Sequence, residues 1–259
     1  MSAERVKLVY SSIGNKNSEI TLIFLHGSSM TKEGMMPVAE GFIQYNCIVF
    51  DLTAHGESLG EEPAEIKTFA EDVENSILQL QRNNIIGKKI VLLGYSMGGA
   101  ITCEIALRKR IKLSGIVLLS SGADLNSYTP LVDDLKAMPI DNFVVADVFP
   151  ALFGIDTPEI NKKIITEHFN STKVSDEISY RDLMVSNGYN HLQECKNIDI
   201  PALLVQGSDD KIVLPMAAVA TWKEIQNSEL LMVPYKGHAL IFEDKELITG
   251  KILSFVEKL

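Results

Sequence analysis

Short apolar runs alternate along the chain with segments whose apolar residues recur at helical spacing. The runs predict strands at 6–10, 20–25, 46–50, 89–93, 115–119, 201–206 and 229–233. The helical pattern occupies 65–83, 98–108, 216–225 and 246–259. Most of the runs are almost continuously apolar, which is typical of strands covered by helices on both faces. The alternation therefore predicts an α/β fold with a mostly parallel central sheet flanked by helices.

One long stretch interrupts this alternation, between the strands predicted at 115–119 and 201–206. It carries helical patterns without a convincing strand, and it is far longer than a single crossover requires. We therefore expect a core formed by residues 1–123 and 198–259, with residues 124–197 inserted as a helical cap over one end of the sheet. Phe143, Phe149 and Phe153 lie in an apolar part of this insertion and are the expected substrate-binding side chains. Alternatively, they only attach the cap to the core.

Charge and hydropathy narrow the classes of partner. The chain of 259 residues has a net charge of −10 and its longest basic run is RKR at 108–110, so we expect no binding to nucleic acid. No segment approaches about 18 uninterrupted apolar residues, and the charged amino-terminus resembles no signal peptide. We expect no secretion and no stable membrane insertion. Nothing in the sequence predicts the oligomeric state.

The three cysteines, Cys47, Cys103 and Cys195, lie far apart without metal-ligand spacing. We interpret them as reduced core residues, which is typical of a cytoplasmic protein. The five histidines also lack metal-ligand spacing, and the chain has no second glycine-rich loop for phosphate. We therefore expect neither a metal nor an organic cofactor.

The segment GYSMG at 94–98 stands directly between a predicted strand and a predicted helix. It has the form Gly-x-Ser-x-Gly, and the strand-to-helix context is the one this motif requires. Gly94 and Gly98 would let the backbone turn sharply and let strand and helix pack closely, with Ser96 pushed out of the sheet at the apex. The N–H of Met97, at the start of the helix, could then stabilise an oxyanion. This arrangement predicts a nucleophilic serine.

A serine hydroxyl needs a base to take its proton and a carboxylate to orient that base. His238 follows the last predicted strand after a short glycine-containing loop, which favours it over His26, His55, His168 and His191. Asp209 and Asp210 follow the preceding strand. Parallel strands end at the same edge of a sheet, so either carboxylate could meet His238 there.

In the order Ser96, Asp210, His238, the chain resembles the α/β-hydrolase fold family over nearly its whole length, as a serine esterase or lipase-like member with a helical cap. The resemblance selects Asp210, because the family places its aspartate in a G-x-x-D pattern after this strand. The early segment FLHGSS at 24–29 resembles the family's His-Gly loop. This likeness implies that the N–H of Ser28 is the second oxyanion donor beside that of Met97.

Two further segments fit the same resemblance. It implies that His26 is a buried structural residue that braces the loop at 24–29. FDLTAHGES at 50–58 is similar to a family segment in which a glycine usually stands at the position of Ala54, so this turn is expected to differ in shape. His55 and Ser58 are interpreted as groups that brace the loop.

These features predict a carboxylesterase-like enzyme that forms an acyl-enzyme on Ser96. Twelve acidic and six basic residues between Asp124 and Asn197 favour neutral, apolar esters of small or medium size as substrates. One alternative is a carbon–carbon hydrolase or lyase of the same fold, which would need an inward cation such as Arg181. Another is a ligand receptor that keeps this pocket without catalysis. The expected partner in the main prediction is a small-molecule ester.

Overall fold

A seven-stranded sheet forms the centre of the protein in a computed structural model that describes residues 6–259. The strands are β1 (Tyr10–Gly14), β2 (Ile20–Leu25), β3 (Asn46–Phe50), β4 (Lys89–Tyr95), β5 (Gly115–Leu119), β6 (Ala202–Gly207) and β7 (Ser228–Val233). Their order in the sheet is β1-β3-β2-β4-β5-β6-β7. Only the pairing of β1 with β3 is antiparallel among these strands, so the predicted mostly parallel α/β sheet is confirmed.

The first strand differs from the prediction, because it begins at Tyr10 and not at Val6. Leu8 buries its side chain in the core without joining the ladder. The backbone of Val9 instead bonds to the loop after β3: its N–H donates to Ser58 Oγ over 2.8 Å, and its carbonyl accepts from the N–H of Asp51 over 2.9 Å. The apolar run at 6–10 therefore reflects burial and not strand pairing.

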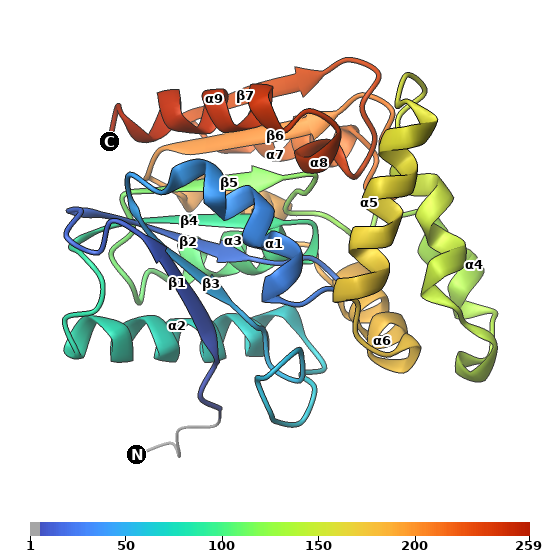
Figure 1. The fold of residues 1–259 in the computed structure, drawn as a ribbon, viewed down its shortest axis with the longest axis horizontal. Coiled ribbons are helices and arrows are strands. Elements are labelled where there is room, and N and C mark those ends of the chain that lie inside the picture. Colours follow the sequence, from blue (N-terminus) through green and yellow to red (C-terminus); the bar gives the residue numbers. More distant parts are fainter. Residues whose placement is uncertain (1–5) are drawn as a thin grey trace.

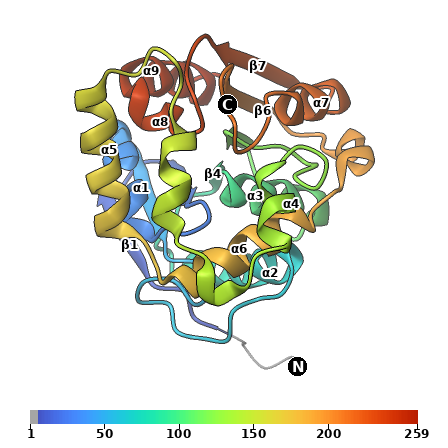
Figure 2. The same ribbon diagram turned by 90° about the vertical axis from the view of Figure 1, so that its right-hand side faces the viewer.

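Helices cover both faces of the sheet (Figure 1). They are α1 (Lys32–Ala39), α2 (Ile66–Arg82), α3 (Met97–Arg108), α4 (Leu131–Lys136), α5 (Glu159–Thr172), α6 (Asp176–Asn187), α7 (Met216–Glu224), α8 (Leu240–Glu243) and α9 (Lys245–Val256). Helices α1 and α9 lie on one face, and α2, α3 and α7 lie on the other (Figure 2). Within residues 6–259, no helix combines the length and the apolar character that crossing a membrane would require.

Local signals account for helix α2, which the sequence predicts, and for helix α1, which it misses. In α2, the buried residues Phe69, Val73 and Ile77 recur every fourth position, which places them on one face toward the core. Helix α1 has only eight residues and contains Gly34 and Pro37, both of which disfavour helix. Burial of its apolar side chains stabilises this short helix.

The segment between β5 and β6 contains α4, α5 and α6 together with three short 3₁₀ helices, Ile140–Asn142, Val145–Leu152 and Leu192–Asn197. Helices α4, α5 and α6 lie beside the carboxyl ends of the parallel strands (Figure 1, Figure 2). We call residues 124–197 the cap. Because the loops after β2, β4, β6 and β7 open toward the same edge, cap side chains and strand-end residues can meet there.

Substitution of Phe42 tests how much packing against the face of the sheet contributes to the free energy of unfolding. Its fully buried ring lies 5.8 Å from that of Phe24 in β2. We expect Phe42→Ala to lower the free energy of unfolding by about 3–5 kcal/mol through lost burial and a cavity. The neighbouring Ile43 is 60% exposed. Ile43→Ala should therefore cost no more than about 0.5 kcal/mol. Urea unfolding of both variants would contradict this packing if the two losses were equal.

Candidate active site

The turn at Ser96 joins β4 to α3 in a strained backbone conformation. Ser96 has φ +53° and ψ −119°, a backbone conformation that residues other than glycine rarely adopt. The turn is held from both sides, because the Ser96 N–H donates to the Leu119 carbonyl over 2.9 Å and the Ser96 carbonyl accepts from Ser121 Oγ over 2.7 Å. Neighbouring elements therefore fix the backbone that presents the Ser96 hydroxyl.

The glycines on either side of Ser96 are required by close backbone approach. A Cβ at Gly94 would lie 2.1 Å from the carbonyl oxygen of Gly98. One at Gly98 would lie 2.4 Å from the carbonyl oxygen of Leu25 and 2.6 Å from that of His26. All three distances are far shorter than the Cβ contacts of folded proteins, so only glycine fits. The steric role that the sequence predicts for these two glycines is confirmed.

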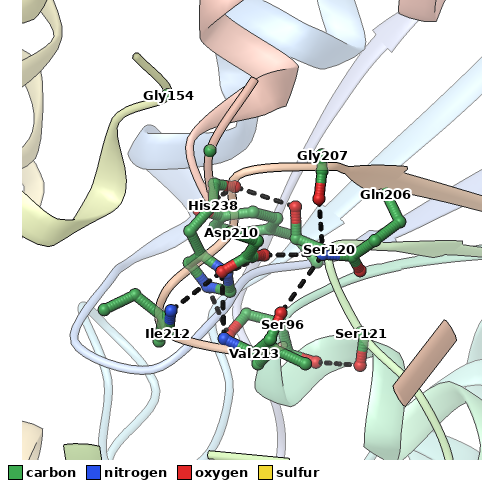
Figure 3. A network of polar contacts seen from close by, with 12 residues as sticks. Ser96, Ser120, Ser121, Gly154, Gln206, Gly207, Asp210, Ile212, Val213 and His238 are labelled. Carbon is green, nitrogen blue, oxygen red and sulfur yellow. Dashed lines mark hydrogen bonds and ion pairs between the residues drawn. The ribbon is translucent and has the colours of Figure 1, made fainter. Parts of the chain in front are cut away.

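Ser96, His238 and Asp210 lie in one hydrogen-bonded chain at the carboxyl edge of the sheet (Figure 3). His238 Nε2 lies 3.0 Å from Ser96 Oγ, and His238 Nδ1 lies 2.8 Å from Asp210 Oδ2. All three residues are buried. Since the ionised carboxylate can only accept, Nδ1 carries the proton and Nε2 is left to accept the serine proton. The structure thus brings together the three residues that the sequence selects.

The carboxylate of Asp210 is held by four donors. Its Oδ1 accepts from the N–H groups of Ile212 and Val213, over 2.9 and 3.0 Å, and its Oδ2 accepts from Gln206 Nε2 over 2.8 Å as well as from His238. Together these donors fix the direction of the carboxylate. Gln206 is a member of this site that sequence reasoning misses, because a lone glutamine in an apolar strand carries no recognisable signal.

Asp209, the alternative carboxylate, points elsewhere. Its Oδ2 accepts from the N–H of Ile155 in the cap over 3.0 Å, and its Oδ1 accepts from Ser208 Oγ over 3.2 Å. It therefore ties the loop after β6 to the cap. The geometry favours Asp210 over Asp209 as the partner of His238.

The loop that carries His238 is supported by residues that the sequence does not single out. The His238 carbonyl accepts from Ser120 Oγ over 2.8 Å and from Tyr95 Oη over 3.2 Å. The N–H of Gly237 donates to Glu243 over 3.1 Å, and burial raises the pKa of this glutamate above its usual value. The sequence feature that could have indicated this support is the polar serine pair at 120–121, directly after the apolar strand β5.

The loop after β2, residues 26–31, lies directly against Ser96, and we call it the β2 loop. A Cβ at Gly27 would lie 3.0 Å from Ser96 Cβ, so this loop and the serine are in contact. Within residues 6–259, the N–H groups of Ser28 and Met97 donate to no protein acceptor. Free N–H groups beside a nucleophile are what an oxyanion hole requires.

Two histidines brace this region, as the sequence predicts. His26 accepts from the N–H of Leu52 at Nε2 over 3.0 Å and lies 2.9 Å from the Gly27 carbonyl at Nδ1. These contacts require the neutral ring, and burial followed by the nearby His55 lowers the pKa of His26 to about 3. His55 is fully buried and bonds to the cap residue Asp182. Both histidines therefore serve the loop and not proton transfer at Ser96.

A mainly apolar cavity opens onto Ser96 and His238. Its apolar wall is formed by Met30, Val145, Val148, Phe149, Leu152, Phe169, Leu183 and Ile212. Ser28, Ser29, Tyr95 and Lys173 complete the lining. In the described part of the chain, no group of three side chains is arranged to hold a metal ion. The cavity suits an uncharged, apolar group next to the hydroxyl of Ser96.

Only one of the three phenylalanines expected to bind substrate lies in the cavity wall. Phe149 lines the cavity, together with Val145 and Leu152 of the same 3₁₀ helix. Phe143 is not part of the lining and packs against Tyr180, with 5.6 Å between ring centres. Phe153 is buried outside the lining too. Phe143 lies before and Phe153 directly after the 3₁₀ helix Val145–Leu152, so neither belongs to the side of this helix that faces the cavity.

Two basic residues of the cap, Arg181 and Lys173, differ in their position relative to the cavity. Arg181, which a carbon–carbon hydrolase would have turned inward, is half exposed and pairs with Glu177 over 2.6 Å. Lys173 lines the cavity, but its Nζ lies 3.4 Å from Asp176 Oδ1. The positive charge at the cavity is therefore partly balanced by a neighbouring carboxylate.

Comparison with known proteins agrees with the fold. The family model described as serine aminopeptidase, S33, matches residues 16–245. The AB hydrolase superfamily protein YisY of Bacillus subtilis is 28% identical, over 97% of this chain and 96% of that protein. A putative esterase/lipase of Haemophilus influenzae is 22% identical, over 92% of this chain and 83% of its own length.

A solved structure shows the same architecture. The crystal structure of a lipase-esterase related protein from Clostridium acetobutylicum superimposes with a TM-score of 0.85 and 29% sequence identity. The match covers 96% of this chain and 99% of that one. The chain is a member of the α/β-hydrolase superfamily and belongs, within it, to the serine aminopeptidase S33 family. These relatives include esterase-like and lipase-like hydrolases, which supports a hydrolase here.

Gly98 tests the contact between the turn at Ser96 and the β2 loop. Gly98→Ala places a methyl group against two backbone oxygens, so we expect a loss of about 2 kcal/mol or more in stability and at least tenfold slower labelling of Ser96 by a fluorophosphonate. Gly250 is the matched control in α9, where nothing lies within 4 Å of an added Cβ. Gly250→Ala should leave labelling unchanged and stabilise the protein by up to about 1 kcal/mol. Equal labelling by both variants would contradict the steric argument.

Proposed function

We propose that the protein is a serine hydrolase that cleaves carboxylic esters through an acyl-enzyme on Ser96. The observation that carries the proposal is the chain of two hydrogen bonds from Ser96 Oγ through His238 to Asp210, placed at the end of an apolar cavity. This chain supplies a nucleophile, a general base and an orienting anion in the geometry that acyl transfer uses.

In the first half of the proposed reaction, Ser96 Oγ attacks the ester carbonyl carbon while His238 Nε2 takes the hydroxyl proton. The carbonyl oxygen becomes an oxyanion, which the N–H groups of Ser28 and Met97 would stabilise. The imidazolium then donates its proton to the leaving alcohol oxygen as the carbon–oxygen bond breaks. Asp210 remains ionised throughout and stabilises the cationic ring of His238.

In the second half, water takes the place of the alcohol. His238 removes a proton from the water, whose oxygen attacks the acyl carbon, and the oxyanion forms again in the same place. Collapse returns the proton to Ser96 Oγ and releases the carboxylic acid. The reaction needs no redox partner and no metal, because both steps are proton-coupled acyl transfers.

The cavity supports neutral esters with a small or medium apolar group as the substrate class. Eight apolar side chains form its wall, and the ammonium of Lys173 is paired with Asp176. An aminopeptidase has to bind a free ammonium group, for which a carboxylate in the cavity is the natural partner. Among the residues that line this cavity in the described chain, none is acidic. This favours esters over amino-terminal peptides.

The proposed partner is the small-molecule ester alone, and the proposed location is the cytoplasm. Support for the location comes from Cys47, Cys103 and Cys195, which are all buried and free of disulfide bonds. Unpaired cysteines are typical of a reducing compartment.

Hydrolysis of p-nitrophenyl esters with two to twelve acyl carbons tests the proposed activity. We expect turnover by the natural protein and a fluorophosphonate adduct on Ser96 in mass spectrometry. Ser96→Ala should lose both, because it removes the nucleophile. Asp210→Asn should lower kcat by about 10⁴-fold, since the amide favours the wrong tautomer of His238.

Asp209 provides the matched control for this experiment, because it is adjacent in sequence and bonds to the cap instead of His238. Asp209→Asn should keep kcat within about tenfold of the natural enzyme. Greater loss in Asp209→Asn than in Asp210→Asn would reverse the choice of carboxylate. A protein that binds esters but forms no adduct would be a receptor, and the proposal would fail.

Substitution of Phe149 tests whether the cavity wall formed by the 3₁₀ helix Val145–Leu152 contacts the acyl chain of the substrate. Phe149→Ala enlarges the cavity, so we expect the optimum acyl chain to become longer by two or more carbons while the rate of fluorophosphonate labelling changes little. Phe143→Ala and Phe153→Ala are controls of the same type, because neither side chain lines the cavity. They should lower stability without moving the optimum. An equal shift in all three variants would contradict the assignment of the wall.

A further inference from the structure

The β2 loop is held by the cap as well as by the core. The N–H of Ser29 donates to Asp182 Oδ2 of α6 over 2.7 Å, and the Ser29 carbonyl accepts from the N–H of Val174 over 3.0 Å. Met30 also forms an antiparallel bridge with Lys173. The cap therefore contacts the loop at the N–H and at the carbonyl of Ser29, the residue that follows Ser28.

Ser29 needs such support because its backbone is strained. It has φ +68°, in the left-handed region that residues with a side chain rarely adopt. A strained conformation persists only where surrounding contacts determine it. This conformation also sets the direction of the peptide between Ser28 and Ser29, and the Ser28 N–H lies on the next peptide, across the Cα of Ser28. The bond from Ser29 to Asp182 thus acts one residue away from the proposed oxyanion donor.

Asp182 is itself fixed by a buried ion pair with His55. His55 Nε2 lies 2.9 Å from Asp182 Oδ2, and His55 Nδ1 lies 2.9 Å from the carbonyl of Thr53. Both neighbours are acceptors, so both ring nitrogens donate and the ring is a cation. Burial lowers the pKa of His55, but the charge and hydrogen bond of Asp182 outweigh it and raise that pKa above its usual value. Both side chains are fully buried.

One oxygen of Asp182 therefore serves two donors, the N–H of Ser29 and the ring of His55. Its other oxygen, Oδ1, is buried and accepts no hydrogen bond among the described residues. The hydrogen bonds that hold this buried carboxylate are thus made to the β2 loop and to the ring of His55.

We infer that Asp182 is a positioning residue of the active site: paired with cationic His55, its carboxylate holds the Ser29 peptide and so directs the Ser28 N–H toward the oxyanion. The inference rests on the proposed function. It also means that the oxyanion hole is complete only while α6 of the cap is docked on the β2 loop. Asp182 does not touch the reacting atoms, and its effect passes through the backbone of the loop.

The test compares Asp182→Asn with Glu177→Gln. Glu177 is an exposed carboxylate on the same helix, where it pairs with Arg181. Asp182→Asn keeps one oxygen that can accept from Ser29 and His55, but it removes the negative charge that pairs with cationic His55 and strengthens the bond to the Ser29 N–H. Three quantities are measured: kcat and KM for the best p-nitrophenyl ester, the affinity for an alkyl boronic acid, and the affinity for the matching primary alcohol. The boronic acid takes Ser96 Oγ to form a tetrahedral anion as His238 takes the proton, whereas the alcohol binds without an oxyanion.

We expect Asp182→Asn to lower kcat and boronate affinity by the same factor, roughly 10- to 100-fold, with KM and alcohol affinity changed less than about threefold. Glu177→Gln should match the natural enzyme. A merely structural role would weaken boronate and alcohol equally, and that result, or no change at all, would overturn the inference. Absence of ester turnover and of boronate inhibition in the natural protein would instead overturn the proposed function.

His55→Gln keeps the test decisive if Asp182→Asn does not fold. Its amide can still donate to Asp182 but supplies no positive charge, so we expect the same split between boronate and alcohol with a smaller factor, roughly three- to tenfold. Equal losses for the two ligands in this variant would overturn the inference as well.

Discussion

The strained turn at Ser96 is the constraint on which the arrangement of the site depends. With φ +53°, the serine can project its hydroxyl above the sheet only if strand, helix and β2 loop approach within distances that exclude a Cβ at Gly94 and Gly98. The same close approach brings the β2 loop, which carries the Ser28 N–H, against Ser96. In the proposed mechanism, the nucleophile and the oxyanion donors Ser28 and Met97 therefore depend on a single packing requirement.

Residues in β6 and directly after β5 support this turn and its partners. Ser121 holds its carbonyl, Ser120 holds the carbonyl of His238, and Gln206 holds Asp210. These hydrogen bonds form in buried surroundings, where they are stronger than in water. The cap adds a second layer, because α6 fixes the β2 loop through Asp182 and the 3₁₀ helix Val145–Leu152 provides much of the apolar wall. Binding and catalysis thus meet at the contact between cap and sheet.

The parts of this arrangement that could be predicted from the sequence are those fixed by local patterns. Continuous apolar runs locate most strands, and glycine spacing around Ser96 identifies the turn. Strand ends at one edge explain why Asp210 and His238 meet, although the choice over Asp209 came from a family pattern. What depends on tertiary packing could not be predicted. The pairing of His55 with Asp182 joins residues 127 positions apart, and no spacing along the chain indicates it.

The most direct test of the central claim is a crystal structure of the protein after reaction with an alkyl fluorophosphonate. The account predicts a covalent bond from Ser96 Oγ to phosphorus, with one phosphoryl oxygen about 2.7–3.1 Å from the N–H nitrogens of both Ser28 and Met97. The bond from Ser29 to Asp182 should remain in place. An adduct on another residue, or a phosphoryl oxygen that meets neither N–H group, would contradict the account.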